Sequence, residues 1–303
     1  MKEAFIEVNG IRKSYNEQLV LENMNFTVDK GEIAGLLGPN GSGKTTMIRL
    51  LNGVILPDEG EMTVDGFNPV KDGNPIRSMS GIVTEGAGLY HEMNALDNLR
   101  FFAQIYSVDQ AEKRIGQLLE QFELTAHKDK LVGTYSTGMK KRLALAKALI
   151  HDPSLLFLDE PTNGLDPEGI KSVMYYLKEL NKQEGTTILI CSHVLHQIED
   201  ICNKYIFMDS GRVIVEGTHE EIEKQYLKDF QLKVETDLHI IGDIYYSYPF
   251  IRLNEKTLIF TVPSKESVSN LLKLILNESS VYSAEILNRD LESLYFQVRR
   301  ENK

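Results

Sequence analysis

The 303-residue sequence predicts an α/β fold built on a largely parallel sheet, followed by a small α+β domain. Short apolar strands alternate with helical segments through most of the chain, and this alternation implies parallel strands joined by crossover helices. After about residue 225 the pattern changes to several short strands around one helix, SVSNLLKLIL. We therefore expect a first domain at 1–222 and a second at 223–303, with a linker near 219–228.

The composition restricts the class of protein. The chain has a net charge of −11, from 33 basic and 44 acidic residues, whereas a general nucleic-acid binder presents a basic face. Its two cysteines, Cys191 and Cys202, are too few for a disulfide framework and suit a reducing cytosol. The start, MKEAFIEVNG, does not resemble a signal peptide, and no run of about 18 apolar residues occurs. If the protein works at a membrane, we expect another chain to cross it.

The first elements of the chain are strands. Residues 3–30 contain two stretches, EAFIEVNGIRKSY and LENMNFTVDKG, that predict extended chain. Residues 60–67, GEMTVDGF, predict a hairpin strand with an Asp-Gly turn. EIAGLLG at 32–38 predicts a short buried strand, and KTTMIRLLNGV predicts a helix that ends near Gly53. The glycine-rich segment GPNGSGKT therefore lies between a buried strand and a helix.

Residues 38–45 predict a phosphate-binding loop, because GPNGSGKT fits the pattern G-x-x-x-x-G-K-[ST]. Its glycines allow backbone N–H groups to surround the β-phosphate, Lys44 reaches the β- and γ-phosphates, and the Thr45 hydroxyl binds Mg²⁺. The alternative, a glycine turn that fits the pattern by chance, is weak between a buried strand and a helix. The candidate ATP-binding residues here are Gly38, Pro39, Asn40, Gly41, Ser42, Gly43, Lys44, Thr45 and Thr46.

Residues 86–150 predict a mostly helical insertion, after which strands and helices alternate again. The apolar strand LLFLD ends at two carboxylates, Asp159 and Glu160, and ligands gather at the carboxyl ends of parallel strands. Asp159 is placed to hold Mg²⁺ through its water shell, and Glu160 is placed to polarise the attacking water. An ordinary strand-to-turn junction also explains two acids, but its weight falls once a phosphate loop is present in the same chain.

A second helix start suited to an anion occurs at 135–142, YSTGMKKR. A serine and a glycine precede the apolar helical run LALAKALI, and the N-terminus of a helix attracts negative charge. An ordinary serine N-cap with a flexible glycine explains Ser136 and Gly138 locally. The chain contains one complete phosphate loop, so the second helix start has no nucleotide of its own.

The motifs GPNGSGKT, YSTGM, LLFLDEP, NGLD and TILICSH follow one another in this order, and the set resembles the ATP-binding subunit of an ABC transporter over residues 3 to about 218. The resemblance implies a P-loop NTPase of the ABC ATPase type, with a parallel core sheet, an antiparallel β subdomain and a helical insertion. It also implies that YSTGM is the signature motif, which acts on ATP held by a second subunit. The signature residues are Ser136, Thr137, Gly138 and Met139. We therefore expect a homodimer, or a heterodimer with a related ATPase subunit, that binds ATP and Mg²⁺.

Single positions have further roles by this resemblance. Tyr15 stands where the family stacks an aromatic ring on adenine, and an aromatic residue of the core is the alternative. Asp166 matches the loop that crosses the dimer interface, and His193 matches the histidine that contacts the γ-phosphate and the attacking water. Glu85 stands where the family usually has Gln, and we expect it to act in catalysis. The predicted metal-binding residues are Thr45, Asp159 and Glu85.

Two departures from the family pattern resemble one subgroup. They are Glu85 and, in the signature, Tyr135, Thr137 and Met139 in place of Leu, Gly and Gln. Both resemble bacterial exporters of drugs and peptide antibiotics and bacteriocin-immunity proteins, of the bacitracin-resistance kind. The segment ending LNRDLESLYFQV resembles the C-terminal extension of those subunits. We expect the second domain to be dimerising or regulatory, with LESLYFQV as an apolar face, and a packing appendage is the alternative.

The predicted function is ATP hydrolysis that powers a separate membrane permease and exports a drug, peptide antibiotic or lipid-like compound. The predicted location is cytoplasmic, peripheral on the inner face of the cell membrane. We expect the permease to dock on residues 86–106, where Leu89, Tyr90, Phe101 and Phe102 are available.

Two alternatives belong to other classes. The first is a non-transport ABC ATPase acting on a nucleic-acid or ribosome complex, and the second is a small-molecule kinase with a P-loop. Chromosome and repair ATPases insert long coiled coils, whereas the 92 residues from Lys44 to Ser136 lack sustained heptads. Translation ATPases carry two cassettes, whereas this chain has one, and a kinase does not need the signature or His193. A transport ATPase without a nucleic-acid partner is therefore favoured.

Overall fold

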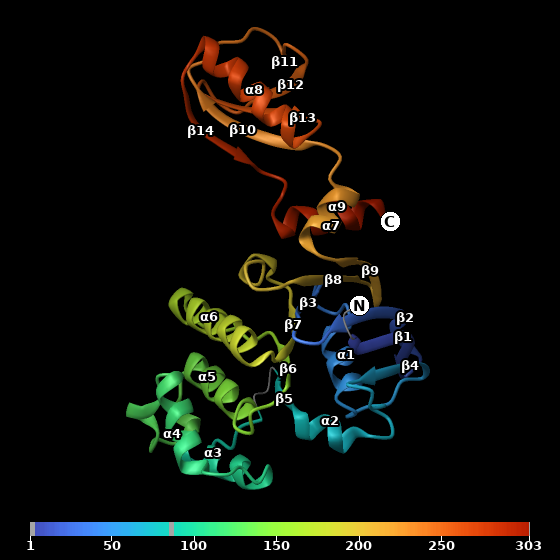
Figure 1. The fold of residues 1–303 in the computed structure, drawn as a ribbon, viewed down its shortest axis with the longest axis vertical. Coiled ribbons are helices and arrows are strands. Elements are labelled where there is room, and N and C mark those ends of the chain that lie inside the picture. Colours follow the sequence, from blue (N-terminus) through green and yellow to red (C-terminus); the bar gives the residue numbers. More distant parts are fainter. Residues whose placement is uncertain (1–3, 85–87, 303) are drawn as a thin grey trace. The chain divides into compact units, whose positions relative to one another are not determined.

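The computed structural model describes residues 4–84 and 88–302. The chain forms two compact units, Met1–Glu216 and Gly217–Lys303. The first unit contains a core sheet, a smaller antiparallel sheet and a group of helices (Figure 1). This arrangement confirms the predicted α/β fold with a parallel core sheet, an antiparallel β subdomain and a helical insertion.

The core sheet contains, in spatial order, β5 (Ser80–Val83), β6 (Leu155–Asp159), β7 (Thr187–Ser192), β3 (Ile33–Leu37), β8 (Lys204–Asp209) and β9 (Arg212–Gly217). The strands from β5 to β8 pair in parallel, and β6 connects to β7 through α6 (Pro167–Glu184). β3, β6 and β7 are buried along their whole length, as expected for parallel strands covered on both faces. The carboxyl ends of these neighbouring strands therefore meet at one end of the sheet.

The antiparallel sheet contains β2 (Gln18–Asp29), β1 (Ala4–Tyr15) and β4 (Glu59–Val64). The predicted Asp-Gly turn follows β4, where Asp65 and Gly66 have φ angles of 50° and 77°. One apolar cluster joins this sheet to α1 (Lys44–Leu51) and to the core sheet, and it includes Met47 and Phe157. This packing fixes α1 and the phosphate loop that precedes it.

The helical insertion contains α3 (Ala95–Ile105), α4 (Ala111–Gln121) and α5 (Thr137–Ala148), with short 3-10 turns at Thr125–His127 and Val132–Thr134. Ser136 caps α5, because its hydroxyl oxygen accepts the N–H of Met139 at 3.2 Å. α5 packs closely on β5, where a Cβ on Gly81 would lie 2.1 Å from the carbonyl oxygen of Ala148. A further helix, α2 (Gly73–Met79), was not predicted, since GNPIRSM is short and contains a proline.

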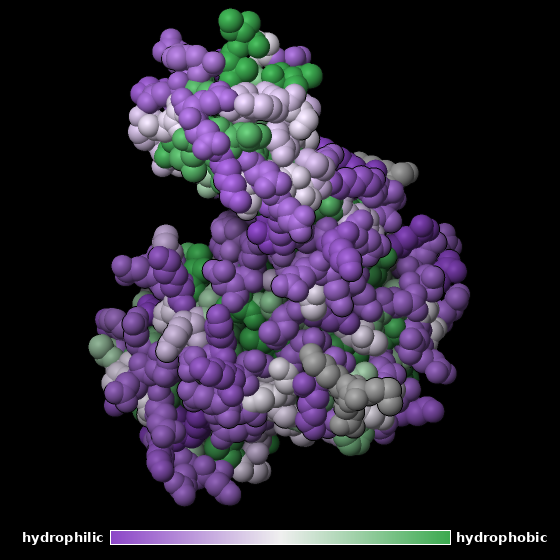
Figure 2. Space-filling model, turned by 45° about the horizontal axis from the view of Figure 1, so that its top comes forward, coloured by the Kyte–Doolittle hydropathy of each residue, from purple (hydrophilic) through white to green (hydrophobic). Residues whose placement is uncertain are grey.

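The C-terminal unit has the predicted α+β character (Figure 1). Its antiparallel sheet contains, in spatial order, β11 (Ile244–Tyr245), β12 (Tyr248–Arg252), β13 (Thr257–Val262), β10 (Phe230–Thr236) and β14 (Val281–Ile286). α8 (Lys265–Glu278) packs on this sheet and buries Leu271 and Ile275. Apolar side chains gather in patches on the surface of this unit (Figure 2), and Ile244, Tyr246 and Ile251 are among those exposed. In the described parts of both units, we find no helix whose length and apolar character would allow it to span a bilayer.

The expected linker near 219–228 is wrong for most of its length, because α7 (His219–Tyr226) occupies it. The start of this helix is a capping box. The Thr218 hydroxyl accepts the N–H of Glu221, and the Glu221 carboxylate accepts the N–H of Thr218. The sequence signal for the start of this helix is a threonine followed three residues later by a glutamate.

The apolar residues of LESLYFQV lie in α9 (Leu291–Glu301), which packs against α7. They do not form a free apolar face, because Leu291, Leu294, Tyr295 and Val298 are buried within the chain. Phe296 is 47% exposed. The burial of this face removes the reason for expecting a dimer contact there.

Candidate functional site

The phosphate loop joins β3 to α1 and turns tightly at its glycines. Gly41 and Gly43 have φ angles of 82° and 103°, a region that favours glycine. A Cβ on Gly38 would lie 2.4 Å from the carbonyl oxygen of Met208, so a side chain is excluded there as well. The loop can therefore present backbone N–H groups to a phosphate at the N-terminus of α1.

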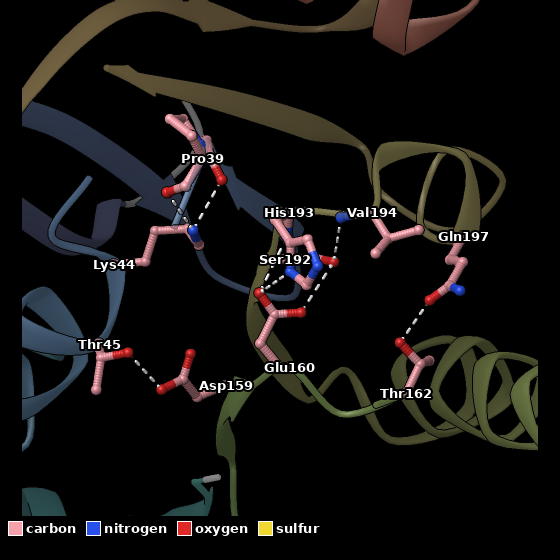
Figure 3. Close-up of polar contacts among 11 residues, drawn as sticks. Pro39, Lys44, Thr45, Asp159, Glu160, Thr162, Ser192, His193, Val194 and Gln197 are labelled. Atoms are coloured by element: carbon pink, nitrogen blue, oxygen red, sulfur yellow. Dashed lines mark hydrogen bonds and ion pairs between the residues drawn. The ribbon is translucent and has the colours of Figure 1, made fainter. Parts of the chain in front are cut away.

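Lys44 opens α1 and is 6% exposed. Its Nζ donates to the carbonyl oxygens of Gly38 and Pro39 at 2.8 and 3.0 Å (Figure 3). Burial lowers the pKa of Lys44, whereas nearby acidic groups, among them Glu160 and Asp159, oppose that shift. The ammonium group is thus held at the phosphate loop, where its charge complements that of a phosphate.

The Thr45 hydroxyl donates to Oδ2 of Asp159 at 2.7 Å (Figure 3). Asp159 is 3% exposed, and burial raises the pKa of its carboxyl group, whereas the hydrogen bond from Thr45 opposes the shift. A hydroxyl and a carboxylate are oxygen ligands that fit Mg²⁺, which keeps waters and substrate phosphates as its other ligands. The described residues contain no cluster of three or more His, Cys, Asp or Glu suited to a metal, so the fit rests on this pair.

Glu160 and His193 face each other at the ends of β6 and β7 (Figure 3). Oε1 of Glu160 lies 2.7 Å from Nδ1 of His193 and accepts the backbone N–H of His193 at 3.1 Å. The Ser192 hydroxyl donates to Oε2 of Glu160 at 3.4 Å. A carboxylate held in this way can accept a proton from water, and the imidazole can orient it.

These side chains line one pocket of about 430 Å³. It forms because β3, β6 and β7 are neighbours whose carboxyl ends meet. Sequence analysis missed two of its residues: Asn163 belongs to the motif NGLD, but Val20 had no recognisable signal. The described lining residues are Val20, Asn40, Gly41, Gly43, Lys44, Thr45, Thr46, Asp159, Glu160, Asn163 and His193.

Four of the predicted ATP-binding residues are not among the described lining residues of this pocket: Tyr15, Gly38, Pro39 and Ser42. Tyr15 lies at the end of β1, is 40% exposed and has Nζ of Lys13 5.6 Å from its ring centroid. The core alternative for Tyr15 is therefore wrong, and Tyr15 is not among the described residues that line the pocket. Its contact with adenine stays a prediction. Glu85 lies outside the described residues.

Three of the four signature residues line a second hollow of about 420 Å³, and Met139 is not among its described lining residues. Ser136, Thr137 and Gly138 lie there beside Asp166, whose Oδ1 accepts the N–H of Gly169 at 3.0 Å and caps α6. The described residues of this hollow are all different from those of the phosphate-loop pocket. One chain therefore presents two helix starts at separate hollows. Phosphate binding at each of them stays a prediction.

Comparison with known proteins identifies the family. A family model described as ABC transporter matches residues 21–163. The uncharacterized ABC transporter ATP-binding protein YhcH of Bacillus subtilis (strain 168) is 30% identical over 301 residues, which cover 98% of this chain and 97% of YhcH. The bacitracin transport ATP-binding protein BcrA of Bacillus licheniformis is 38% identical over 229 residues, covering 75% of this chain and 74% of BcrA.

A solved structure agrees with these relatives. It is the dimeric post-hydrolysis state of the ATP-binding cassette MJ0796 bound to ADP and Pi, with a TM-score of 0.65 and 26% identity. The match covers 70% of this chain and 98% of that structure. The fold, the pocket and the relatives agree: this chain belongs to the ABC transporter ATP-binding proteins, and it is an ATPase of that family.

Proposed function

We propose that this chain is the ATP-hydrolysing subunit of an exporter and powers a separate membrane permease. The observation that carries the proposal is the single pocket in which Lys44, Thr45 and Asp159 lie with the Glu160–His193 pair. The likeness to BcrA favours export of a drug, peptide antibiotic or lipid-like compound. The subunit works on the cytoplasmic side, peripheral on the inner face of the membrane.

Each residue of the pocket has a separate task in hydrolysis. The phosphate loop and Lys44 bind the β- and γ-phosphates, and Thr45 and Asp159 hold the Mg²⁺ that neutralises phosphate charge. Glu160 accepts a proton from the attacking water, and His193 orients Glu160 and reaches toward the γ-phosphate. Glu85 is a further candidate for catalysis and for holding Mg²⁺, by its position in the sequence alone.

The second helix start, at Ser136, serves the nucleotide of a partner subunit. The N-terminus of α5, where Ser136 accepts the Met139 N–H, lines a hollow that the phosphate loop of the same chain does not line. A homodimer uses each chain twice, once through Lys44 and once through Ser136. The dimeric state of the MJ0796 cassette supports this arrangement.

Mixing two inactive variants tests the shared site. Lys44→Ala disables the phosphate loop and Ser136→Arg blocks the signature, so either homodimer has two defective sites. A mixed dimer has one intact site, formed by Lys44 of one chain and Ser136 of the other. We therefore expect ATPase activity to return when the two inactive proteins are mixed. Ser107→Arg is the matched control, because Ser107 is exposed and is not among the described lining residues of the phosphate-loop pocket or of the signature hollow. Full activity of Ser136→Arg alone, measured as a monomer, would contradict the shared site.

The proposed docking surface for the permease lies on the helical insertion. The Tyr90 and Phe101 rings are 5.0 Å apart and the Phe101 and Phe102 rings are 5.4 Å apart, both edge to face. Tyr90 is 46% exposed, whereas Leu89, Phe101 and Phe102 are half-buried. An aromatic cluster that is partly open to solvent suits an apolar partner segment.

Crosslinking tests this surface. Cysteines in place of Tyr90 and Ile105, both exposed, should form crosslinks to the permease in the assembled complex. Background from the natural thiols is low, since Cys191 is buried and Cys202 is half-buried. Tyr246→Cys, at an exposed position of the C-terminal unit, is the control. Crosslinks from position 246 alone would contradict docking on the insertion.

A further inference from the structure

Two loops carry the Glu160–His193 pair, one after β6 and one after β7. A second contact joins the same two loops, because the Thr162 hydroxyl donates to Oε1 of Gln197 at 2.5 Å. Figure 3 shows this hydrogen bond beside the Glu160–His193 contact. Thr162 lies two residues after Glu160, and Gln197 ends the 3-10 turn Leu195–Gln197, four residues after His193. Thr162 thus follows Glu160 closely in the chain, and Gln197 follows His193 closely.

The backbone conformation of Glu160 requires support from neighbouring residues. Its φ angle is 49°, in the left-handed region that non-glycine residues rarely adopt, and Pro161 further restricts it. Such a conformation persists only where its surroundings determine it. On one side, the N–H of Glu160 donates to the Cys191 carbonyl at 3.0 Å. On the other side, the Asn163 N–H donates to the Glu160 carbonyl at 3.3 Å, inside the turn that Thr162 anchors.

The Thr162–Gln197 bond is well placed to provide that anchor. Thr162 is 3% exposed and Gln197 is half-buried, so water competes weakly for the hydroxyl. The carbonyl of Thr162 also accepts the N–H of Leu165 at 3.1 Å, which fixes the next part of the loop. Neither Thr162 nor Gln197 is among the described residues that line the phosphate-loop pocket. Any effect of this bond on hydrolysis is therefore indirect and passes through loop residues that do line the pocket, which are Glu160, Asn163 and His193.

We propose that Thr162 and Gln197 are positioning residues, whose hydrogen bond holds the loops of Glu160 and His193 at the separation that hydrolysis requires. The proposal rests on the roles proposed above for Glu160 and His193. A small displacement of a reacting group costs far more rate than binding, because the phosphates are held elsewhere in the pocket. Loss of the bond should therefore lower kcat and leave the KM for ATP nearly unchanged.

The test uses the whole chain, four variants at Thr162, Gln197 and Thr187, and Glu160→Gln as the reference for loss of the general base. Thr162→Val removes the hydroxyl and keeps the shape, and we expect kcat to fall by about 10- to 100-fold with little change in KM. Gln197→Leu should show the same pattern. Gln197→Glu keeps a side-chain oxygen that accepts from Thr162, and should retain more activity than Gln197→Leu. Thr187→Val is the matched control, because the Thr187 hydroxyl is also buried and accepts the Gly31 N–H at 2.9 Å. Thr187 is the first residue of β7, whereas the pocket lies at the carboxyl end of that strand.

The outcomes separate the positioning role from the proposed function. A Thr162→Val protein with kcat within about twofold of the parent overturns the positioning role, if Glu160→Gln is inactive in the same assay. An equal fall in kcat for Thr187→Val also overturns the positioning role, because the loss of any buried threonine hydrogen bond would then lower kcat. If Thr162→Val does not fold, the ratio of Gln197→Glu to Gln197→Leu decides, and equal activities overturn the proposal. Normal turnover in Glu160→Gln instead overturns the role of Glu160 itself.

Discussion

Glu160→Gln is expected to stop ATP turnover while ATP binding survives. Glutamine has nearly the same shape, and its amide oxygen can still accept the N–H of His193, so the pocket keeps its form. The amide cannot take up a proton from water, and loss of a general base costs a factor of about 100 to 10,000 in rate. We therefore expect a rate at least about 100-fold below that of the parent.

Steady-state ATPase rates measure the loss of turnover, and gel filtration with ATP measures the retained ATP binding. An ATP-bound dimer that cannot turn over should accumulate, so the variant should elute as a dimer in the presence of ATP. Glu120→Gln, at an exposed position of α4, removes one carboxylate of the same kind and should leave the rate unchanged. Normal turnover in Glu160→Gln would show that another group activates the water.

Lys44→Ala is expected to remove most of the affinity for ATP. The substitution deletes the ammonium group that the phosphate loop holds through the carbonyls of Gly38 and Pro39. A hydrogen bond to a charged group is worth about 1.5–3 kcal/mol, and two phosphates lose their partner at once. We therefore expect binding to weaken by at least about 100-fold, since each 1.4 kcal/mol is tenfold.

Titration of the purified chain with a fluorescent ATP analogue measures this loss. Lys171→Ala, which removes an exposed lysine of α6, is the control for a change in net charge alone. Unfolding temperature without nucleotide should be measured beside it, because Lys44 is buried and its stem packs in the loop. Parent-like ATP affinity in Lys44→Ala would mean that the loop binds phosphate through its backbone alone.

Much of the fold followed from local patterns. The apolar runs IAGLL, LLFLD and TILICS predicted the buried strands that became β3, β6 and β7. The phosphate loop was also predictable, because its glycines and Lys44 act within one short segment. The segments that sequence analysis missed had weaker patterns. α2 is short and contains a proline. α7 begins at a capping box, but the helix itself contains few apolar residues.

The C-terminal unit shows where a local pattern misleads. The apolar positions of LESLYFQV predict an apolar helix face, and α9 has one. The sequence does not say what that face contacts, since a partner subunit and another helix of the same chain offer the same hydrophobic gain. The structure places α7 against α9, so the face is already buried.

The sequence by itself determined which segment forms the candidate phosphate loop, which strands are buried and which family the motifs resemble, because each depends on residues that are neighbours in the chain. Only the tertiary structure decided that Glu160 lies 2.7 Å from His193 and that Thr162 bonds Gln197. Those contacts exist because β6 pairs with β7 in parallel, which brings together loops more than 30 residues apart. Strand order is set by the packing of the whole core, and no short segment of the chain encodes it.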